Sequence, residues 1–195
     1  DGTRRTNVML ARDTAANVAS SLLGGERKRL QDRLGTAPVQ AALQAGDLDA
    51  AGKALAADWP SLEAARVLPP DLDTVYAGLP AAGFGPLAAM EAALVEDGAV
   101  ASVVRVDGTP RVALAAPARV GAVLAGVAYV QLPLARATQG LESADVDPST
   151  YVALRQGGFT LLERGDTAQA EAAERMAVPV TGTSLRVAAA VPHVG

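Results

Sequence analysis

The stretch VGAVLAGVAYVQLPLA (residues 120–135) is the longest in the sequence without a charged residue, and it lies between Arg119 and Arg136. A membrane-spanning helix needs about 20 consecutive apolar residues, so this stretch is too short to cross a bilayer. Its two glycines would interrupt a helix, and Gln131 and Pro133 lie near one end, whereas four valines and a tyrosine favour a strand. We therefore predict that it forms the buried central strand of a sheet, with a buried helix as the alternative.

Further strands are predicted on both sides of this stretch. Asp107-Gly108 and Gly157-Gly158 are signals for tight hairpin turns, and consecutive strands joined by short turns form antiparallel sheets. The other predicted strands are ASVVRV (101–106), RVALAAPA (111–118), YVALRQ (151–156), FTLLER (159–164) and SLRVAAAV (184–191).

The first part of the chain has the periodicity of helices. An apolar stripe recurs at spacings of three and four and predicts a long helix at residues 8–34. Paired glycines weaken a helix, so a kink or a change of register is predicted at Gly24-Gly25. Shorter helices are predicted after Thr36 and at residues 48–58, 87–95 and 166–175. The residues of the stripe are Val8, Ala11, Ala15, Val18 and Leu22.

This order of elements predicts an α+β fold, in which a long N-terminal helix and small helices pack on a roughly five-stranded antiparallel sheet. Residues 1–35 are predicted as the N-terminal helix, and residues 36–195 as the domain with which that helix forms a single structural unit. The sequence begins at Asp1 without a methionine or an apolar leader, so we expect a fragment or a processed form of a longer protein.

Composition excludes several classes of function. The net charge of −4 gives no basic surface for nucleic acid, and the basic residues at 26–29 alternate with acidic and polar ones as on a solvated helix face. The chain has no cysteine, which excludes a disulfide scaffold, thiolate zinc sites and cysteine catalysis. No nucleic-acid partner is therefore expected.

No catalytic group is predicted. The single histidine, His193, is one of the last three residues of the sequence, where a solvated tail residue is expected, and no Ser-His-Asp arrangement can be built around it. The glycines at 24–25 precede a lysine but do not have the spacing of a phosphate-binding loop.

Acidic residues occur in local groups but do not have the pattern of a metal site. Asp71 and Asp73 form one pair, and a second group precedes Pro148, which stands where a calcium loop would have to turn. We interpret the second group as an acidic loop in which Asp147-Pro148 opens a turn. We expect neither a metal nor a cofactor in this chain. The second group is Glu142, Asp145 and Asp147.

A half-open sheet covered by helices can hold a small molecule, with a few polar side chains to orient it. Arg105 and Tyr129 lie in predicted strands, and Tyr151 or Arg155 could face the same side. These four residues are the candidate ligand contacts. The alternative is that they point into solvent and bind nothing.

The order of elements resembles that of Cache (PAS-like) sensor domains, which lie outside the cytoplasm in bacterial membrane proteins. GAVLAGVAYVQLPLARAT resembles the Cache segment in which a central strand ends in a Leu-Pro turn and runs into a short helix. VTGTSLRVAAAVP is similar to the final pair of strands, which leads back to the membrane. The resemblance implies a periplasmic sensor domain between flanking membrane helices that this chain does not contain.

A narrower resemblance is to the N-terminal extracytoplasmic region of the membrane-anchored bacterial phosphomannomutase/phosphoglucomutase. This resemblance rests on VLPPDLD, the segment from Phe84 to Glu96, DGTPRVALAAPARVGAVLAGVAYVQLPL, YVALRQGG and the closing VTGTSLRVAAAVP. The phosphoserine, metal and sugar-recognition loops of such mutases are absent from these residues. The resemblance therefore implies that the mutase chemistry, an isomerase reaction, belongs to another part of the parent protein.

Two functions of different classes follow from the sequence. The first is a sensory or regulatory domain, with or without a small ligand, that passes a change in helix geometry across the membrane. The second is a dimerisation or anchoring module, in which the stripe from Val8 to Leu22 pairs with a second copy of the chain. A stand-alone enzyme is the least favoured function, because nothing in the sequence supplies its chemistry.

Overall fold

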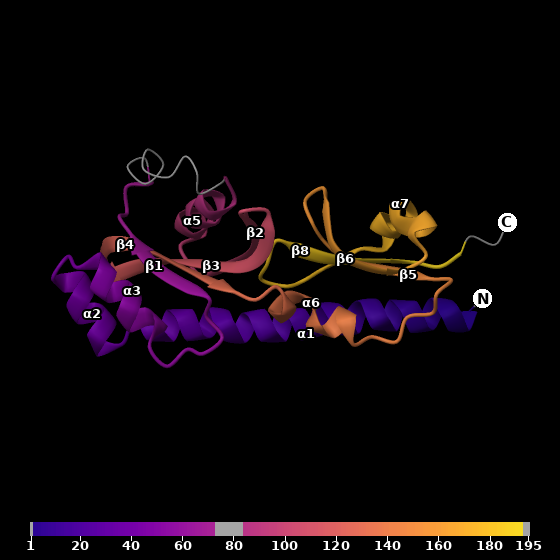
Figure 1. Cartoon of the computed structure of the whole chain (residues 1–195), viewed down its shortest axis with the longest axis horizontal. Coiled ribbons are helices and arrows are strands. Elements are labelled where there is room, and N and C mark those ends of the chain that lie inside the picture. The colour runs from indigo at the N-terminus through magenta and orange to yellow at the C-terminus, as the bar shows by residue number, and fades with distance from the viewer. Residues whose placement is uncertain (1, 73–83, 193–195) are drawn as a thin grey trace. The chain divides into compact units, whose positions relative to one another are not determined.

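The computed structural model describes residues 2–72 and 84–192 and divides the chain into two units (Figure 1). Unit 1 comprises residues 1–23 and 135–195, and unit 2 comprises residues 24–134. Within the described residues each unit has its own four-stranded antiparallel sheet. The predicted α+β class is confirmed, but the single sheet of about five strands is replaced by two sheets. Asp73 and His193 lie outside the described residues.

Helix α1 (Gly2–Leu34) contributes its first part to unit 1 and its last part to unit 2. The predicted kink at Gly24-Gly25 does not end the helix, because Leu23, Glu26 and Leu30 on either side of the glycines are all buried on one face. Packing of that face compensates for the low helix propensity of the two glycines. No helix within the described residues combines the length and apolarity that crossing a membrane requires.

The uncharged stretch at residues 120–135 forms the core of the sheet in unit 2. β4 runs from Val123 to Leu132 between β1 and β3, so the predicted central strand is confirmed. The stretch also includes the end of β3 and a turn at Gly121, whose φ of 59° suits glycine. The strand order is β1-β4-β3-β2. The strands are β1 (Ala64–Leu68), β2 (Val100–Val106), β3 (Thr109–Val120) and β4 (Val123–Leu132).

The β2–β3 hairpin confirms the predicted turn at Asp107-Gly108. Asp107 has φ of 51° and Gly108 has φ of 79°, the pair of positive values that a two-residue hairpin turn requires. Short helices cover both faces of the sheet in unit 2 (Figure 1). Asp47 caps one of them by accepting a hydrogen bond from the Ala50 N–H at 3.0 Å. The helices are α2 (Ala37–Gln44), α3 (Leu48–Ala56) and α5 (Phe84–Glu96).

Unit 1 is built around the second sheet, with strand order β6-β5-β8-β7. The predicted hairpin at Gly157-Gly158 is confirmed, because it joins β5 to β6. The segment predicted as one short helix at 166–175 is instead a series of three short helical turns. The elements are α6 (Ala135–Glu142), β5 (Tyr151–Gln156), β6 (Phe159–Gly165), η1 (Thr167–Gln169), α7 (Ala170–Ala173), η2 (Glu174–Met176), β7 (Val178–Pro179) and β8 (Leu185–Ala190).

Candidate functional site

One face of the sheet in unit 2 carries a buried apolar cluster, to which α5 contributes. Because directly opposed residues of antiparallel strands point to the same side, Val127 and Tyr129 of β4 share this face with Leu68 of β1 and Ala115 of β3. Helix α5 packs mainly on β2 and β3. The buried cluster consists of Leu68, Ala89, Met90, Ala93, Val104, Ala113, Ala115, Val127 and Tyr129.

Polar side chains gather at one end of this face, where β4 ends and β1 begins. Tyr129 is only 6% exposed, and its hydroxyl accepts a hydrogen bond from Gln131 Nε2 at 2.9 Å. Burial raises the pKa of Tyr129, although the Gln131 bond opposes that shift, so the hydroxyl stays protonated and free to donate. Arg66 stands directly opposite Tyr129 in the β1–β4 register. We call Arg66, Tyr129 and Gln131 the polar end of the sheet.

Arg66 is the unusual member of this group. Its side chain is exposed and makes no hydrogen bond or ion pair within the part of the chain that the structure describes. Arg111, farther along the same face, is instead paired with Glu63 at 3.1 Å. A guanidinium beside a buried hydroxyl, a side-chain amide and an apolar cluster can bind a small molecule that carries a carboxylate and an aliphatic group.

The four predicted ligand residues are divided between the two sheets. Tyr129 faces the apolar cluster, whereas Arg105 lies between Val104 and Val106 on β2 and therefore projects from the opposite side of that sheet. The Arg105 guanidinium hydrogen-bonds the Gly108 carbonyl oxygen at 3.4 Å, beside the hairpin turn. Tyr151 and Arg155 belong to the other sheet. The expectation that all four could face the same side is thus corrected.

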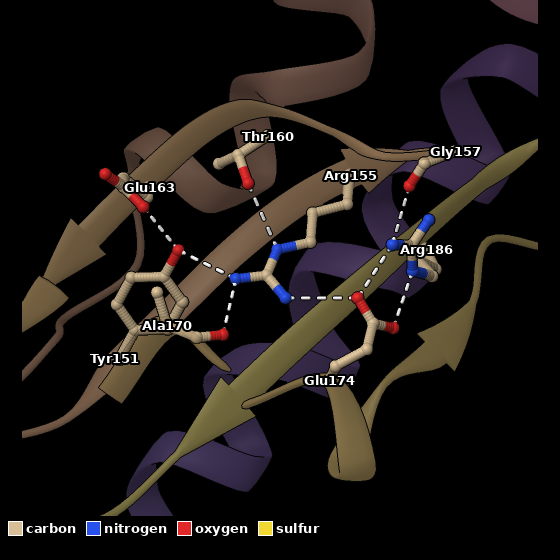
Figure 2. Close-up of polar contacts among 8 residues, drawn as sticks. All are labelled: Tyr151, Arg155, Gly157, Thr160, Glu163, Ala170, Glu174 and Arg186. Atoms are coloured by element: carbon tan, nitrogen blue, oxygen red, sulfur yellow. Dashed lines mark hydrogen bonds and ion pairs between the residues drawn. The ribbon is translucent and has the colours of Figure 1, made fainter. Parts of the chain in front are cut away.

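Tyr151 and Arg155 are brought together in unit 1, four residues apart on one face of β5 (Figure 2). Arg155 is 7% exposed, and its Nη2 donates to the Tyr151 hydroxyl at 3.1 Å and to the Ala170 carbonyl oxygen at 2.8 Å. Its Nε donates to Thr160 Oγ1 at 3.2 Å, and its guanidinium carbon lies 5.6 Å from the centre of the Tyr151 ring. The Tyr151 hydroxyl in turn donates to Glu163.

The last partner of Arg155 is the Glu174 carboxylate, which also pairs with Arg186 of β8 (Figure 2). Arg155 Nη1 lies 3.1 Å from Glu174 Oε1, and Arg186 donates from Nη2 to Oε1 and from Nε to Oε2, both at 2.7 Å. The Arg186 hydrogen bonds, with a smaller contribution from Arg155, lower the pKa of Glu174 to about 2. The carboxylate is therefore charged at every pH at which proteins ordinarily work.

The lowered pKa predicts how the stability of unit 1 changes in acid. The folded pKa of about 2 is below the ordinary 4.5, so the ion pairs stabilise the fold above pH 4.5 and this contribution is lost as the pH falls toward 2. Because the side chain is 45% exposed, solvent screening keeps the effect below what the pKa difference alone implies. We expect the stability difference between wild type and Glu174→Gln to shrink steadily over this range in thermal melts. A difference that stays constant from pH 4.5 to 2 would contradict the assignment.

The stripe that was predicted to pair with a second chain is used inside unit 1. Val8, Ala11 and Ala15 are buried, and Val18 and Leu22 are partly buried. Helix α6 approaches the stripe so closely that a Cβ on Gly140 would lie 2.8 Å from Val18 Cβ. These side chains therefore serve intramolecular packing, and the exposed residues of α1 belong to its other faces.

The interpretation of the acidic loop is confirmed at Asp147. Its carboxylate accepts hydrogen bonds from the Ser149 backbone N–H and hydroxyl, both at 2.8 Å, and so opens the turn before β5. The bonds from Ser149 lower the pKa of the Asp147 carboxyl, with a minor contribution from the charge of Arg4. No cluster of three or more metal-ligating side chains occurs among residues 2–72 and 84–192.

Sequence reasoning missed Arg66, Gln131, Glu174 and Arg186. Gln131 could have been found, because it stands two residues after Tyr129 on a predicted strand and must share its face. The other three become neighbours of Tyr129 or Arg155 only through the pairing of β1 with β4 and β5 with β8, and through the return of η2 onto the sheet. No local pattern in the sequence carries that information.

Comparison with known proteins shows what this fold resembles. The ligand-binding domain of the Pseudomonas fluorescens chemoreceptor CtaA, solved in complex with L-leucine, is similar over 98% of this chain and 97% of its own length, with 14% identity and a TM-score of 0.58. The likeness shows that this chain shares the overall fold of that domain. The sensor domain of the V. cholerae histidine kinase DctB matches 50% of this chain and 56% of its own, with 11% identity and a TM-score of 0.32, too low to support an argument. No protein-family model and no curated protein sequence matches this chain.

Proposed function

We propose that this chain is the extracytoplasmic ligand-binding domain of a bacterial membrane signalling protein, and that it binds an amino acid at the polar end of the sheet in unit 2. The observation that carries the proposal is the exposed guanidinium of Arg66, which has no partner among residues 2–72 and 84–192 and stands opposite Tyr129, beside Gln131 and the apolar cluster. Arg66 would bind the α-carboxylate, and the apolar cluster would contact an aliphatic side chain. The fold shared with a receptor domain that holds L-leucine supports this ligand class.

Location and parent protein are part of the same proposal. We infer a periplasmic position, because the similar solved structure is the ligand-binding domain of a chemoreceptor. Flanking membrane helices outside this chain stay a prediction from the resemblance to Cache domains. A chemoreceptor or another signalling protein is the parent that the fold supports. The phosphomannomutase/phosphoglucomutase parent stays a prediction from resemblance, and neither similar structure adds support to it.

Ligand binding can be tested by thermal shift with the twenty standard L-amino acids, each at the same concentration and ionic strength. A ligand at 100 times its dissociation constant stabilises a folded domain by about 2.7 kcal/mol, so at least one amino acid should raise the melting temperature by several degrees. Arg66→Ala removes the proposed carboxylate contact and should abolish the shift.

Arg105→Ala is the matched control for this experiment. It removes the same side chain from the same sheet but from its opposite side, so the shift should persist. The proposal fails if none of the twenty amino acids stabilises the wild type, or if the stabilisation survives in Arg66→Ala.

A further inference from the structure

The Glu174 carboxylate in unit 1 is held as a bound carboxylic acid would be held. Its two oxygens receive three charged hydrogen bonds from two guanidinium groups, two of them from Arg186 in a bidentate arrangement. Figure 2 shows the carboxylate between Arg155 and Arg186, with the two arginines on neighbouring strands.

Both arginines have hydrogen-bond partners besides Glu174. Arg155 is fixed by Tyr151, Thr160 and the Ala170 carbonyl oxygen, and Arg186 Nη2 also donates to the Gly157 carbonyl oxygen at 2.8 Å. They are directly opposed in the β5–β8 register, where like charges repel each other. The sheet therefore presents a preformed pair of cations that requires an anion between them.

The segment that supplies this anion packs on the core of unit 1 through the small side chains of Ala170, Ala173 and Ala177. Glu174 begins η2, at the end of three successive short helical turns, and among residues 167–176 only Ala173 is buried. The Glu174 side chain is 45% exposed, so solutes can reach the carboxylate from solvent. Segments with few buried apolar contacts open at low cost in free energy.

We propose that Arg155 and Arg186 form a binding site for a small carboxylic acid in unit 1, which the tethered carboxylate of Glu174 occupies when that ligand is absent. The site lies in a different unit from the polar end of the sheet and does not depend on the function proposed for it. On binding, the carboxylate of the ligand replaces that of Glu174 between the two arginines, and the side chain of Glu174 moves into solvent.

Ligand binding at this site can affect α1, because hydrogen bonds join α1 to the chain that follows Glu174. Two residues after Glu174, the Met176 carbonyl oxygen accepts a hydrogen bond from Arg12 Nη1 of α1 at 2.7 Å. Ser20 of α1 also donates to the Thr181 carbonyl oxygen at 3.3 Å, in the loop that follows β7. Release of Glu174 frees η2 and so weakens the contact between Met176 and Arg12.

Tethering sets the concentration at which a free ligand competes. A side chain on a short segment acts at an effective concentration on the order of millimolar or above, so a simple carboxylate must reach that range to displace it. Glu174→Ala removes the tethered competitor and leaves the two arginines facing a vacant space of carboxylate size.

The test uses sodium acetate and the whole chain, with sodium chloride at equal ionic strength as reference and with Arg66→Ala in every variant so that unit 2 contributes nothing. We expect acetate to stabilise the Glu174→Ala variant saturably. Its apparent Kd for acetate should be at least about tenfold lower than that of the Arg66→Ala reference, which keeps Glu174. Glu174→Gln, whose amide still fills the space, should gain no such affinity. Glu174→Ala/Arg186→Ala should lose it.

Hydrogen exchange on the Arg66→Ala reference, in which Glu174 is intact, provides the second readout. Acetate should speed the exchange of amides at residues 167–177 and in the first part of α1, because η2 loosens from Arg12. The proposal is overturned if Glu174→Ala shows no saturable response beyond that to chloride, if the response survives removal of Arg186, or if acetate leaves the exchange of residues 167–177 unchanged. None of these results bears on amino-acid binding in unit 2.

Discussion

Gly165→Ala is expected to destabilise unit 1 by at least about 3 kcal/mol, enough to unfold it in much of the population. Gly165 ends β6 with φ of 99°, a conformation that alanine adopts only at considerable cost. A Cβ there would lie 2.0 Å from the Thr150 carbonyl oxygen and 2.9 Å from the carbonyl carbon. Both atoms belong to the backbone, so no side-chain rotation can relieve the overlap.

Relief of that overlap would also disturb the sheet on which the arginine pair stands. The Thr150 carbonyl oxygen accepts a hydrogen bond from the Asp166 N–H at 2.7 Å, and Gly165 is directly opposite Tyr151 at the start of β5. Moving Thr150 away from a new methyl group would break this bond and shift the strand that carries Tyr151 and Arg155. The buried hydroxyl and guanidinium would then lose partners, which adds to the cost.

Hydrogen exchange at β5 amides measures this loss within unit 1, whereas a whole-chain melt combines two units that need not unfold together. Gly158→Ala is the control, because Gly158 lies at the other end of the same strand pair, has no positive φ, and has open space where the Cβ would go. We expect Gly158→Ala to leave β5 protection close to that of wild type. Equal protection in the two variants would show that the close approach at Gly165 does not restrain the fold.

Hairpins were the part of the fold that sequence could predict. The turn at Asp107-Gly108 and the turn at Gly157-Gly158 join strands that are neighbours in the chain, so local turn chemistry determines their pairing. The pairing of β1 with β4 and of β5 with β8 joins distant segments, and nothing local distinguishes one sheet of about five strands from two sheets of four. That distinction depends on which helices each strand packs against.

The candidate sites show the same limit at the level of single side chains. Tyr151 and Arg155 are four residues apart on one predicted strand, so their common face follows from the two-residue period of a strand. The carboxylate that pairs with Arg155, Glu174, belongs to a different segment. No sequence period predicts that this segment returns onto the sheet. Arg105 illustrates the opposite error, because parity on β2 already separates it from the side chains that pack against α5.

Trp59→Ala is expected to destabilise unit 2 by about 3 to 5 kcal/mol, the usual cost of removing a large buried aromatic side chain. Trp59 is 3% exposed, and the Arg29 guanidinium carbon lies 5.8 Å from its ring centre. Its Nε1–H donates to Glu26 Oε2 at 3.2 Å, and Ser61 Oγ donates to the same oxygen at 3.1 Å. Truncation therefore creates a cavity and also removes one hydrogen bond from a buried carboxylate on α1.

Two conservative variants separate these contributions. Trp59→Phe keeps much of the ring but removes the N–H, so its cost should be close to that of one hydrogen bond to a charged group, about 1.5 to 3 kcal/mol. In a Glu26→Gln background the acceptor is neutral, and the cost of Trp59→Phe should fall, because the bond it removes is no longer charge-assisted. The protection of β4 amides from hydrogen exchange measures the stability of each of these variants. Tryptophan fluorescence cannot be used, because Trp59 is the only tryptophan in the sequence and each substitution removes it. A loss below about 1 kcal/mol for Trp59→Ala would contradict the prediction, because a cavity and a broken buried bond together should cost more than that.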